Sequence, residues 1–221
     1  MAAVTDGGAA HFFPEVSGAL LAGGHGRRMG ADKATLPFDG GTLGGRVLAV
    51  LAQLCGEVLA VERPGQRHDM LWPEPVRTVH DRPDWPVCAL SGIHAALTAA
   101  RHPWLLVMAT DLAFPSPHLA EGLIRTALKT LPTPRLVVPW TGEVAHPLMA
   151  VYHRSLAPEI ARRIEAGELR VQALARDLGV RVAESTLSTW DPELGGLVNV
   201  NTPEQLEAAR SRLAARRKEQ A

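Results

Sequence analysis

The chain has 221 residues, of which 46% are hydrophobic and 21% are charged, a composition typical of one soluble globular domain with a substantial core. Lysine plus arginine and aspartate plus glutamate both total 23, so the formal net charge is zero. This balance excludes an overall field that would attract nucleic acid or an acidic membrane, and any anion must be held locally.

Residues 1–15 are mostly small and lack periodicity apart from two phenylalanines. We expect most of them to form a flexible tail, followed by a single domain over residues 16–221. A short apolar run at 17–21 has the length of a buried strand and ends at a cluster of glycines. The first strand of the domain is therefore predicted there.

Helical and strand patterns alternate along the rest of the chain. Thr42 can cap a helix with near-helical apolar spacing, and the unbroken W-L-L-V-M-A run at 104–109 suits a strand covered on both faces. Helices are predicted at 42–54, 91–100, 116–131, 155–165, 170–178 and from residue 202 onward. Further strands are predicted at 57–61, 76–79, 104–109, 135–139, 147–152, 180–183 and 197–200. This alternation indicates an α/β fold with a three-layer, doubly wound, mostly parallel (mixed) sheet of the Rossmann-like kind.

A glycine-rich loop follows the first strand. Its glycines are Gly23, Gly24, Gly26 and Gly30. Closely spaced glycines let backbone N–H groups approach an anion and form a concavity that suits phosphate. The same segment carries Arg27, Arg28 and Lys33, although the whole chain has only three lysines. The loop matches neither the dinucleotide fingerprint nor the Walker A pattern, so a mobile basic surface loop stays an alternative to a phosphate-binding loop.

Two aspartates follow predicted strands directly. Asp81 comes after the strand at 76–79, and Asp111 comes after the strand at 104–109. Ligands of parallel sheets bind outside the carboxyl ends of the strands, so both carboxylates and the glycine loop are expected to share one cleft. A carboxylate there can hold Mg²⁺, which keeps waters and substrate phosphates as its other ligands. The alternative is that Asp111 only caps a turn.

The segment L-A-G-G-H-G-R-R-M-G-A-D-K at 21–33 resembles the L-A-G-G-x-x-x-R-M-G-x-x-D-K loop of the molybdenum cofactor guanylyltransferases (MobA), within the nucleotide-sugar pyrophosphorylase-like group. It is one residue shorter between Gly30 and Asp32. Related cytidylyltransferases typically carry L-A-A-G, so Gly23 favours the guanylyl branch. The resemblance covers 18–206 and implies a Rossmann-like nucleotidyltransferase fold, GTP as the nucleotide and Mg²⁺ as the cofactor.

The resemblance also implies roles for single residues. The implied nucleotide-binding residues are Leu21, Ala22, Gly23, Gly24, Lys33, Asp81 and Asp111. Asp111 is also the implied metal ligand, and Lys33 and Arg28 join it as catalytic residues. Cys88-Ala89 replaces a family Gly-Pro pair and places Cys88 near the substrate, and Ala113 replaces a proline. The family's asparagine after the second strand corresponds by spacing to Ala60, so that base or ribose contact is missing or comes from elsewhere.

The segment G-L-V-N-V-N-T-P-E-Q-L at 196–206 is close to the family's F-V-N-V-N-T-P-E-E-L. The resemblance implies that Asn199 and Asn201 face the pterin substrate. Turn geometry before a helix is the alternative, and it fits Asn201 better than Asn199. The helix start itself is indicated by a capping threonine, a proline at the first helical position and a glutamine three residues after the cap.

A mechanism follows from charge once this family is assumed. The terminal phosphate of molybdopterin would attack the α-phosphorus of GTP in line and expel pyrophosphate. A phosphate monoester has a second pKa of about 6, so it is largely a dianion at neutral pH and needs no general base. We expect Mg²⁺ on Asp111, together with Lys33 and Arg28, to neutralise the triphosphate. Partners beyond GTP and molybdopterin would be proteins that make or receive the molybdenum cofactor.

Two alternatives stay open from the residues. The first is a sibling nucleotidyltransferase that uses CTP or a sugar-phosphate acceptor, which Gly23 disfavours. The second is a protein that binds pterin or nucleotide without turnover, suggested by the departures at Ala60, Cys88, Ala89 and Ala113. Lys33 and Asp111, the residues most directly tied to chemistry, favour an enzyme.

The sequence also indicates the compartment and the state of the cysteines. The first lysine or arginine is Arg27, so a basic secretory signal is absent, and no apolar run approaches the roughly 18 residues of a membrane helix. We therefore expect a cytoplasmic protein. Cys55 and Cys88 lack C-x-x-C spacing, which argues against a zinc site or a disulfide framework, and Cys55 is predicted to be buried.

Overall fold

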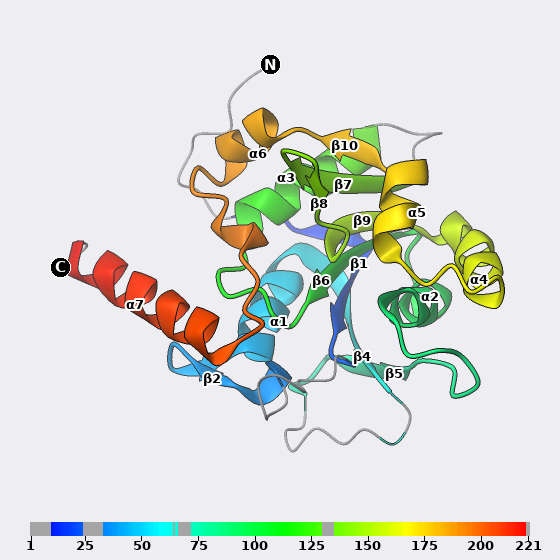
Figure 1. Cartoon of the computed structure of the whole chain (residues 1–221), viewed down its shortest axis with the longest axis horizontal. Coiled ribbons are helices and arrows are strands. Elements are labelled where there is room, and N and C mark those ends of the chain that lie inside the picture. Colours follow the sequence, from blue (N-terminus) through cyan, green and yellow to red (C-terminus); the bar gives the residue numbers. More distant parts are fainter. Residues whose placement is uncertain (1–9, 24–32, 64, 66–71, 130–134, 220–221) are drawn as a thin grey trace.

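The computed structural model describes residues 10–23, 33–63, 65, 72–129 and 135–219, which form a sheet with helices on both faces (Figure 1). The strands of this eight-stranded sheet are β1 (Phe13–Leu21), β4 (Cys55–Glu62), β5 (Arg77–His80), β6 (Trp104–Ala109), β7 (Leu136–Thr141), β8 (Val144–Ala145), β9 (Met149–His153) and β10 (Val180–Val182). A separate hairpin pairs β2 (Pro37–Phe38) with β3 (Gly41–Thr42). The α-helices are α1 (Leu43–Leu54), α2 (Ala89–Ala99), α3 (Pro117–Lys129), α4 (Ala157–Glu165), α5 (Val171–Leu178), α6 (Glu184–Trp190) and α7 (Pro203–Glu219). The short 3₁₀ helices are η1 (Lys33–Thr35), η2 (Arg154–Leu156) and η3 (Gly195–Leu197).

The strand order is β10-β7-β9-β6-β1-β4-β5, with β8 paired to β7. The pairs β1–β4, β1–β6, β4–β5 and β7–β10 are parallel, whereas β9 runs antiparallel between β6 and β7. This arrangement confirms the predicted mostly parallel, mixed sheet. The chain moves outward from β1 to β4 on one side and returns to β6 on the other, which places a topological switch point at the carboxyl end of β1.

Alternating side chains of the strands build two cores. On one face α1, α3 and α6 cover residues such as Leu106 and Met108 of β6. On the other face α2, α4 and α5 cover Leu105 and Val107 of the same strand. All six residues of β6 are buried, as predicted for a strand covered on both faces. A third cluster joins the β2–β3 hairpin to α7 through residues next to Asp111.

The sheet begins earlier in the chain than predicted. Phe13 is buried and pairs with Cys55, so β1 includes residues that we expected in the N-terminal tail. Residues 1–9 of that tail lie outside the described residues. The identity of Phe13 was a usable signal, because phenylalanine is among the residue types that are most often buried.

The strand predicted at 197–200 was wrong. Residues 195–197 form η3, and Asn199 makes only an isolated bridge with Leu112. The turn is compact because Leu194 adopts a left-handed φ of 49° and Val198 N–H donates to the Gly195 carbonyl at 3.0 Å. The apolar side chain of Val200 packs in the third cluster rather than on the sheet.

Helix α6 was not predicted at all. Its E-S-T-L-S-T-W sequence is poor in strong helix formers, and Leu187 is its single buried residue. Packing on α3 holds it, because Gly122 lets the Trp190 indole approach so closely that an added Cβ would lie 2.3 Å from the ring. A glycine inside a helix is intrinsically unfavourable, and this contact explains its presence.

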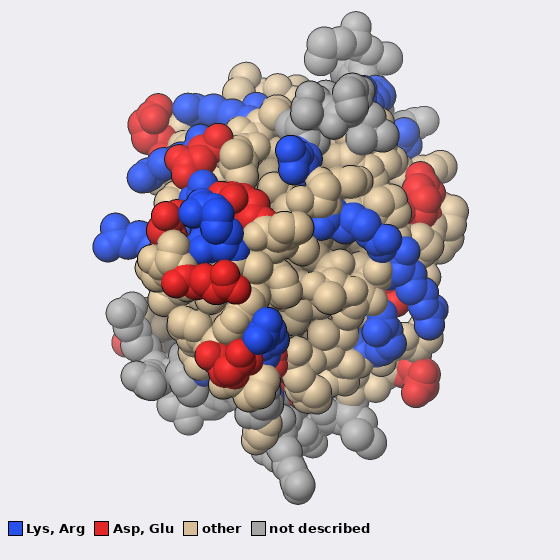
Figure 2. Space-filling model, turned by 90° about the vertical axis from the view of Figure 1, so that its right-hand side faces the viewer, with Lys and Arg blue, Asp and Glu red and all other residues tan. Residues whose placement is uncertain are grey.

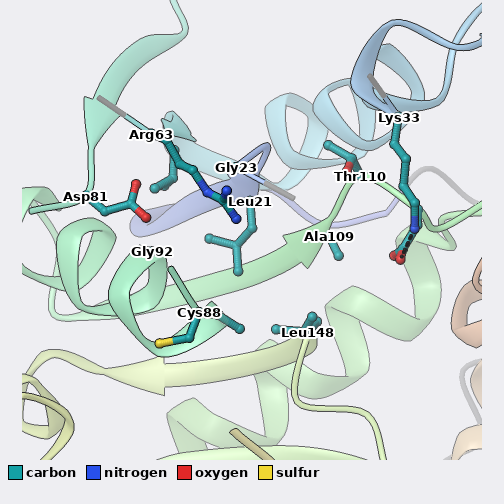
Figure 3. A pocket seen from close by; sticks show the side chains of 13 residues that line it. Leu21, Gly23, Lys33, Arg63, Asp81, Cys88, Gly92, Ala109, Thr110 and Leu148 are labelled. Atoms are coloured by element: carbon teal, nitrogen blue, oxygen red, sulfur yellow. Dashed lines mark hydrogen bonds and ion pairs between the residues drawn. The ribbon is translucent and has the colours of Figure 1, made fainter. Parts of the chain in front are cut away.

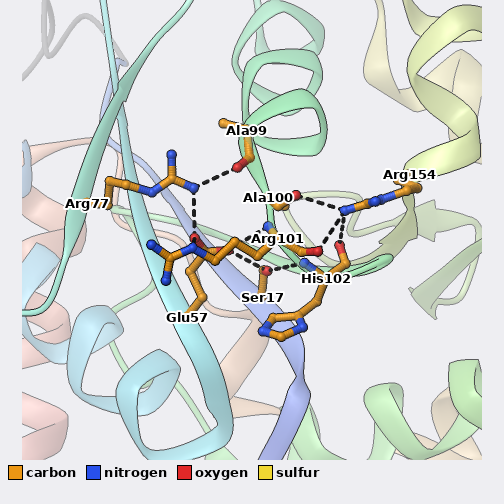
Figure 4. A network of polar contacts seen from close by, with 8 residues as sticks. All are labelled: Ser17, Glu57, Arg77, Ala99, Ala100, Arg101, His102 and Arg154. Atoms are coloured by element: carbon orange, nitrogen blue, oxygen red, sulfur yellow. Dashed lines mark hydrogen bonds and ion pairs between the residues drawn. The ribbon is translucent and has the colours of Figure 1, made fainter.

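A buried carboxylate ties the opposite end of the sheet together (Figure 4). Glu57 at the start of β4 accepts hydrogen bonds from Ser17 Oγ at 2.8 Å, Arg77 Nη2 at 2.7 Å and the Arg101 backbone N–H at 2.8 Å. Burial alone would raise the pKa of Glu57, but these donors outweigh it and lower the pKa below the ordinary value. The carboxylate thus joins β1, β4, β5 and the end of α2.

We expect Glu57→Ala to reduce the free energy of unfolding by about 2 kcal/mol, because it removes a buried acceptor and leaves the Ser17 hydroxyl and the Arg101 N–H without this partner. A lowered folded pKa stabilises the protein above the ordinary carboxyl pKa, and this contribution is lost as the pH falls toward the folded value. Urea denaturation at pH 7 and pH 4 should therefore show a smaller difference between Glu57→Gln and the parent at the lower pH. Glu143→Ala, whose side chain is 91% exposed, is the control. Differences that stay the same at both pH values would contradict this role.

Charges are paired on the side of the molecule that carries α4 and α5. Arg162 and Glu159 lie 2.9 Å apart, and Arg163 and Asp177 lie 2.7 Å apart. Figure 2 shows Lys and Arg side chains beside Asp and Glu side chains on this side. Within the described part of the chain, none of the helices has the length and apolar character needed to span a membrane.

Candidate active site

A pocket of about 200 Å³ opens at the carboxyl ends of β1, β4, β5 and β6 (Figure 3). Its walls come from the strand ends, the first residue of η1, the N-terminal turn of α2 and the residue before β9. The lining residues are Leu21, Gly23, Lys33, Val61, Arg63, Asp81, Cys88, Ala89, Gly92, Ala109, Thr110, Asp111 and Leu148. The pocket lies at the switch point, where a ligand of this class of sheet is expected.

The structure brings most of the predicted nucleotide-binding residues to this pocket. The residues that line it as predicted are Leu21, Gly23, Lys33, Asp81 and Asp111. Ala22 is 1% exposed, and its N–H donates to the Val61 carbonyl at 2.9 Å, so its side chain lies beneath the surface of the pocket. Gly24 and Arg28 lie outside the described residues, so their predicted roles are not examined by the structure.

Lys33 is held at the pocket by the close packing of η1 on α1. An added Cβ at Gly44 would lie 2.8 Å from the Ala34 carbonyl oxygen, so only glycine permits this approach. The Lys33 ammonium donates hydrogen bonds to Asp111 Oδ2 at 3.2 Å and to Asn201 Oδ1 at 2.6 Å. The two residues of the ion pair are separated by 77 intervening positions in sequence, and both side chains are largely shielded, with 15% and 17% exposure.

The other oxygen of Asp111 is available to a ligand. Asp111 Oδ1 is buried and has no hydrogen-bond partner among the described residues. A buried carboxylate oxygen without a donor is suited to a hard cation such as Mg²⁺. The described residues contain no group of three acidic, histidine or cysteine side chains that would hold a metal alone.

Asp81 lies at the opposite end of the pocket from Lys33 (Figure 3). It follows β5, its backbone N–H donates to the Glu62 carbonyl at 3.1 Å, and it is 9% exposed. Its Oδ1 has no partner among the described residues. Burial raises the pKa of Asp81, while the positive charges of Arg63 and His80 act in the opposite direction. Such an oxygen is placed to accept a hydrogen bond from a ligand.

Arg63 is a lining residue that the sequence reasoning missed. It directly follows β4, the same strand-end position that drew attention to the two aspartates. The sequence comparison pointed by spacing to Ala60, which is fully buried inside β4 and cannot contact a ligand. Gly23 lies against Arg63, because an added Cβ there would come within 3.2 Å of the arginine Cγ. Arg63 thus brings a cationic side chain to the end of β4 at the pocket.

The N-terminal turn of α2 forms another wall. Cys88 is the residue before the helix, and its Sγ lies 3.3 Å from Ser91 Oγ. Both Cys88 and Ala89 line the pocket. That Cys88 lies near the substrate stays a prediction. The Cys88-Ala89 pair therefore supplies a lining surface in place of the family's Gly-Pro pair. Cys55 is buried, as predicted, and burial raises the pKa of its thiol to about 12.

A second pocket of about 210 Å³ adjoins the first. Its lining includes Leu112, His146, Gln172 and Asn199, and Leu148 lines both pockets. Asn199 therefore lies apart from Asn201, whose side chain contacts Lys33 instead. The predicted pair of asparagines is thus divided between two neighbouring sites.

The histidines near these pockets have structural partners. His146 Nε2 lies 2.8 Å from Thr141 Oγ1, and burial lowers the pKa of this imidazole. His94 packs edge-on against Trp85 at 4.6 Å between ring centroids, and burial likewise lowers its pKa. Both imidazoles therefore have a hydrogen-bond or packing partner within the fold. His25 lies outside the described residues.

Comparisons with known proteins identify a family and relatives that this chain resembles in sequence. The profile of the MobA-like NTP transferase domain matches residues 18–182. Molybdenum cofactor guanylyltransferase from Desulfosudis oleivorans is 33% identical over 205 residues, covering 91% of this chain and 98% of its own. Probable molybdenum cofactor guanylyltransferase from Mycobacterium avium is 35% identical over 202 residues, covering 88% and 94%.

Solved structures show the same fold. The crystal structure of molybdopterin-guanine dinucleotide biosynthesis protein A from Archaeoglobus fulgidus has a TM-score of 0.75 and 27% identity, covering 90% of this chain and 99% of its own. The 2-C-methyl-D-erythritol 4-phosphate cytidylyltransferase from Thermus thermophilus has a TM-score of 0.61 and 19% identity, covering 89% and 98%. The second likeness concerns the fold alone.

Proposed function

Because this chain belongs to the MobA-like NTP transferase family, we propose that it transfers GMP from GTP to the terminal phosphate of molybdopterin, with or without bound molybdenum, and releases pyrophosphate. The observation that carries this proposal is the meeting of Lys33 and Asp111 at 3.2 Å on the wall of a strand-end pocket. The Lys33 ammonium, together with an Asp111 carboxylate that can hold a metal ion, suits the negative charge of a triphosphate. Relatives named for molybdenum cofactor guanylyltransferase support this choice of reaction.

Charge neutralisation is the main task of the residues in this reaction. The attacking phosphate and the triphosphate are both anionic, so their repulsion must be reduced before they meet. Lys33 supplies a shielded ammonium, and we place Arg28 on the same triphosphate. Mg²⁺ held by Asp111 Oδ1 would supply further positive charge to the phosphate oxygens. No residue is needed to remove a proton from the acceptor, since a phosphate monoester is largely a dianion at neutral pH.

Guanine suits the end of the pocket that carries Asp81 and Arg63. The guanine edge presents N–H donors beside the O6 acceptor. The unpartnered Asp81 oxygen would accept from those donors, and the Arg63 guanidinium lies on the same side to donate to O6. Cytosine presents one amino donor beside its N3 and O2 acceptors, so it would offer the carboxylate a single donor group where guanine offers two adjacent ones. This complementarity supports GTP over CTP.

The acceptor would occupy the second pocket. Asn199 and Gln172 provide polar groups there, and the shared wall at Leu148 connects this pocket to the nucleotide site. An acceptor phosphate can then approach the phosphates of GTP from the neighbouring pocket. The pterin would lie on the side of Asn199, as the sequence resemblance implies.

A test of the proposal measures pyrophosphate formed from GTP and Mg²⁺ with and without molybdopterin. We expect release only when both substrates are present. A thermal-shift series with GTP, CTP, UTP and ATP should show the largest stabilisation with GTP, since ligand binding to the native state raises apparent stability. Preference for CTP would assign the chain to the cytidylyl branch, and GTP binding without pyrophosphate release would favour a non-catalytic binding protein.

A further inference from the structure

The side-chain amide of Asn201 contacts the lysine of the nucleotide site. Asn201 Oδ1 accepts a hydrogen bond of 2.6 Å from Lys33 Nζ, across 168 positions of sequence. The same ammonium donates to Asp111 Oδ2 at 3.2 Å. A lysine ammonium has three donors, so these two contacts leave one N–H for a phosphate oxygen.

The backbone that carries Asn201 is fixed beside Asp111. Val200 N–H donates to the Asp111 carbonyl at 2.8 Å, and Ala113 N–H donates to the Val198 carbonyl at 3.1 Å. Val200 is 1% exposed in the third cluster, which anchors this segment. The N–H of Asn201 itself donates to Gln205 Oε1 at 2.7 Å in the first turn of α7. The amide oxygen is therefore held in place before any ligand binds.

We propose that Asn201 is a positioning residue that orients the Lys33 ammonium toward the nucleotide triphosphate, and that it does not bind the acceptor. This inference rests on the proposed function, in which Lys33 binds the triphosphate. The division of labour between Asn199 and Asn201 follows from their positions, since Asn199 lines the second pocket. The two asparagines of one short motif thus serve different substrates.

The neutrality of the amide is part of this role. An amide oxygen accepts one N–H of the lysine without adding a negative charge, so the only charge that offsets the ammonium among its two contacts is that of Asp111. A carboxylate at this position would accept the same hydrogen bond but place another negative charge beside Asp111 and the triphosphate. Asparagine therefore orients the lysine and leaves the site attractive to an anion.

The test measures binding of GTP in the presence of Mg²⁺ and the absence of acceptor, by titration calorimetry. We expect Asn201→Ala to weaken GTP binding about 10-fold, a typical effect of losing a hydrogen bond to a charged group. Asn201→Asp should weaken it at least as much. Guanosine lacks the triphosphate, so its affinity, measured by competition with GTP, should not change in either variant. Asn199→Ala is the matched control, with unchanged GTP affinity and a raised KM for molybdopterin.

Gln205→Ala tests whether a GTP defect comes from loss of the Asn201 side-chain contact to Lys33 or from general loosening of the backbone around Asn201. It removes the partner of the Asn201 N–H, but the backbone bonds of Val200 and Ala113 still hold the segment beside Asp111. GTP affinity should therefore stay within about two-fold of the parent. The inference is overturned if Asn201→Ala binds GTP normally and raises only the KM for molybdopterin, or if Gln205→Ala reproduces the GTP defect. Failure of the parent protein to bind GTP would instead remove the proposed function, and the two outcomes are distinguishable.

Discussion

Lys33→Ala should reduce Mg²⁺-dependent pyrophosphate release from GTP by about 100-fold to 1,000-fold, and Asp111→Ala should reduce it by at least as much. Removing a single group that stabilises transition-state charge in a shielded site typically costs about 100-fold to 1,000-fold in rate, and Asp111 would also lose the metal. Both side chains are less than one-fifth exposed, so bulk water does not replace their charges. A coupled assay for pyrophosphate at saturating GTP measures the effect.

Controls for this experiment use the same substitutions away from the pocket. Lys129→Ala and Asp84→Ala change an exposed lysine and an exposed aspartate whose side chains do not line the nucleotide pocket. We expect both to keep the parent's activity and all four proteins to unfold at similar temperatures. Full turnover in both Lys33→Ala and Asp111→Ala would rule out the assigned chemistry.

Asp81→Asn should change the preferred nucleotide from GTP to XTP. Xanthine carries a carbonyl where guanine carries the 2-amino group, so the asparagine amide can donate where the aspartate accepted. One good pair of hydrogen bonds to a base is worth about 1–3 kcal/mol. Leaving buried hydrogen-bond donors of guanine without an acceptor costs more, so GTP affinity should fall about 100-fold. Competition between GTP and XTP for each protein measures the change.

The same variant should not lose stability. Burial raises the pKa of Asp81, so the favourable contribution of this group to folding is present below its ordinary pKa and is lost as the pH rises through the raised value. At pH 7 the buried carboxylate is therefore a cost to the fold, and an asparagine that cannot ionise should unfold at the same or a higher temperature. Unchanged preference for GTP would show that Asp81 does not read the base. A large decrease in thermal stability would contradict the folding cost assigned to its buried carboxylate.

The sequence was informative where a local pattern had a direct structural cause. The run at 104–109 predicted β6 because complete apolarity is typical of a strand covered on both faces. Asp81 and Asp111 were found together because parallel strands place their carboxyl ends at one edge of the sheet. The family resemblance added the role of each residue, which position alone does not supply.

What the sequence did not reveal depended on contacts between distant segments. The bond between Lys33 and Asn201 crosses 168 positions, and no local pattern indicates it. Residues 197–200 were predicted to form a strand, but Val200 packs against α7 and its neighbours instead of joining the sheet. Helix α6 packs on α3 because Gly122 leaves room for the Trp190 ring, and a single glycine in α3 does not indicate in the sequence which residue packs against it.

The wall that Leu148 contributes to both pockets has a consequence for inhibition. A reaction product that joins nucleotide and acceptor would occupy both cavities at once and make the contacts of both substrates through one tethered molecule. Linked ligands gain affinity because the second half binds at a high effective concentration. Turnover should therefore slow as product accumulates, and a non-hydrolysable bisubstrate compound with a phosphate bridge of matching length should bind more tightly than either half.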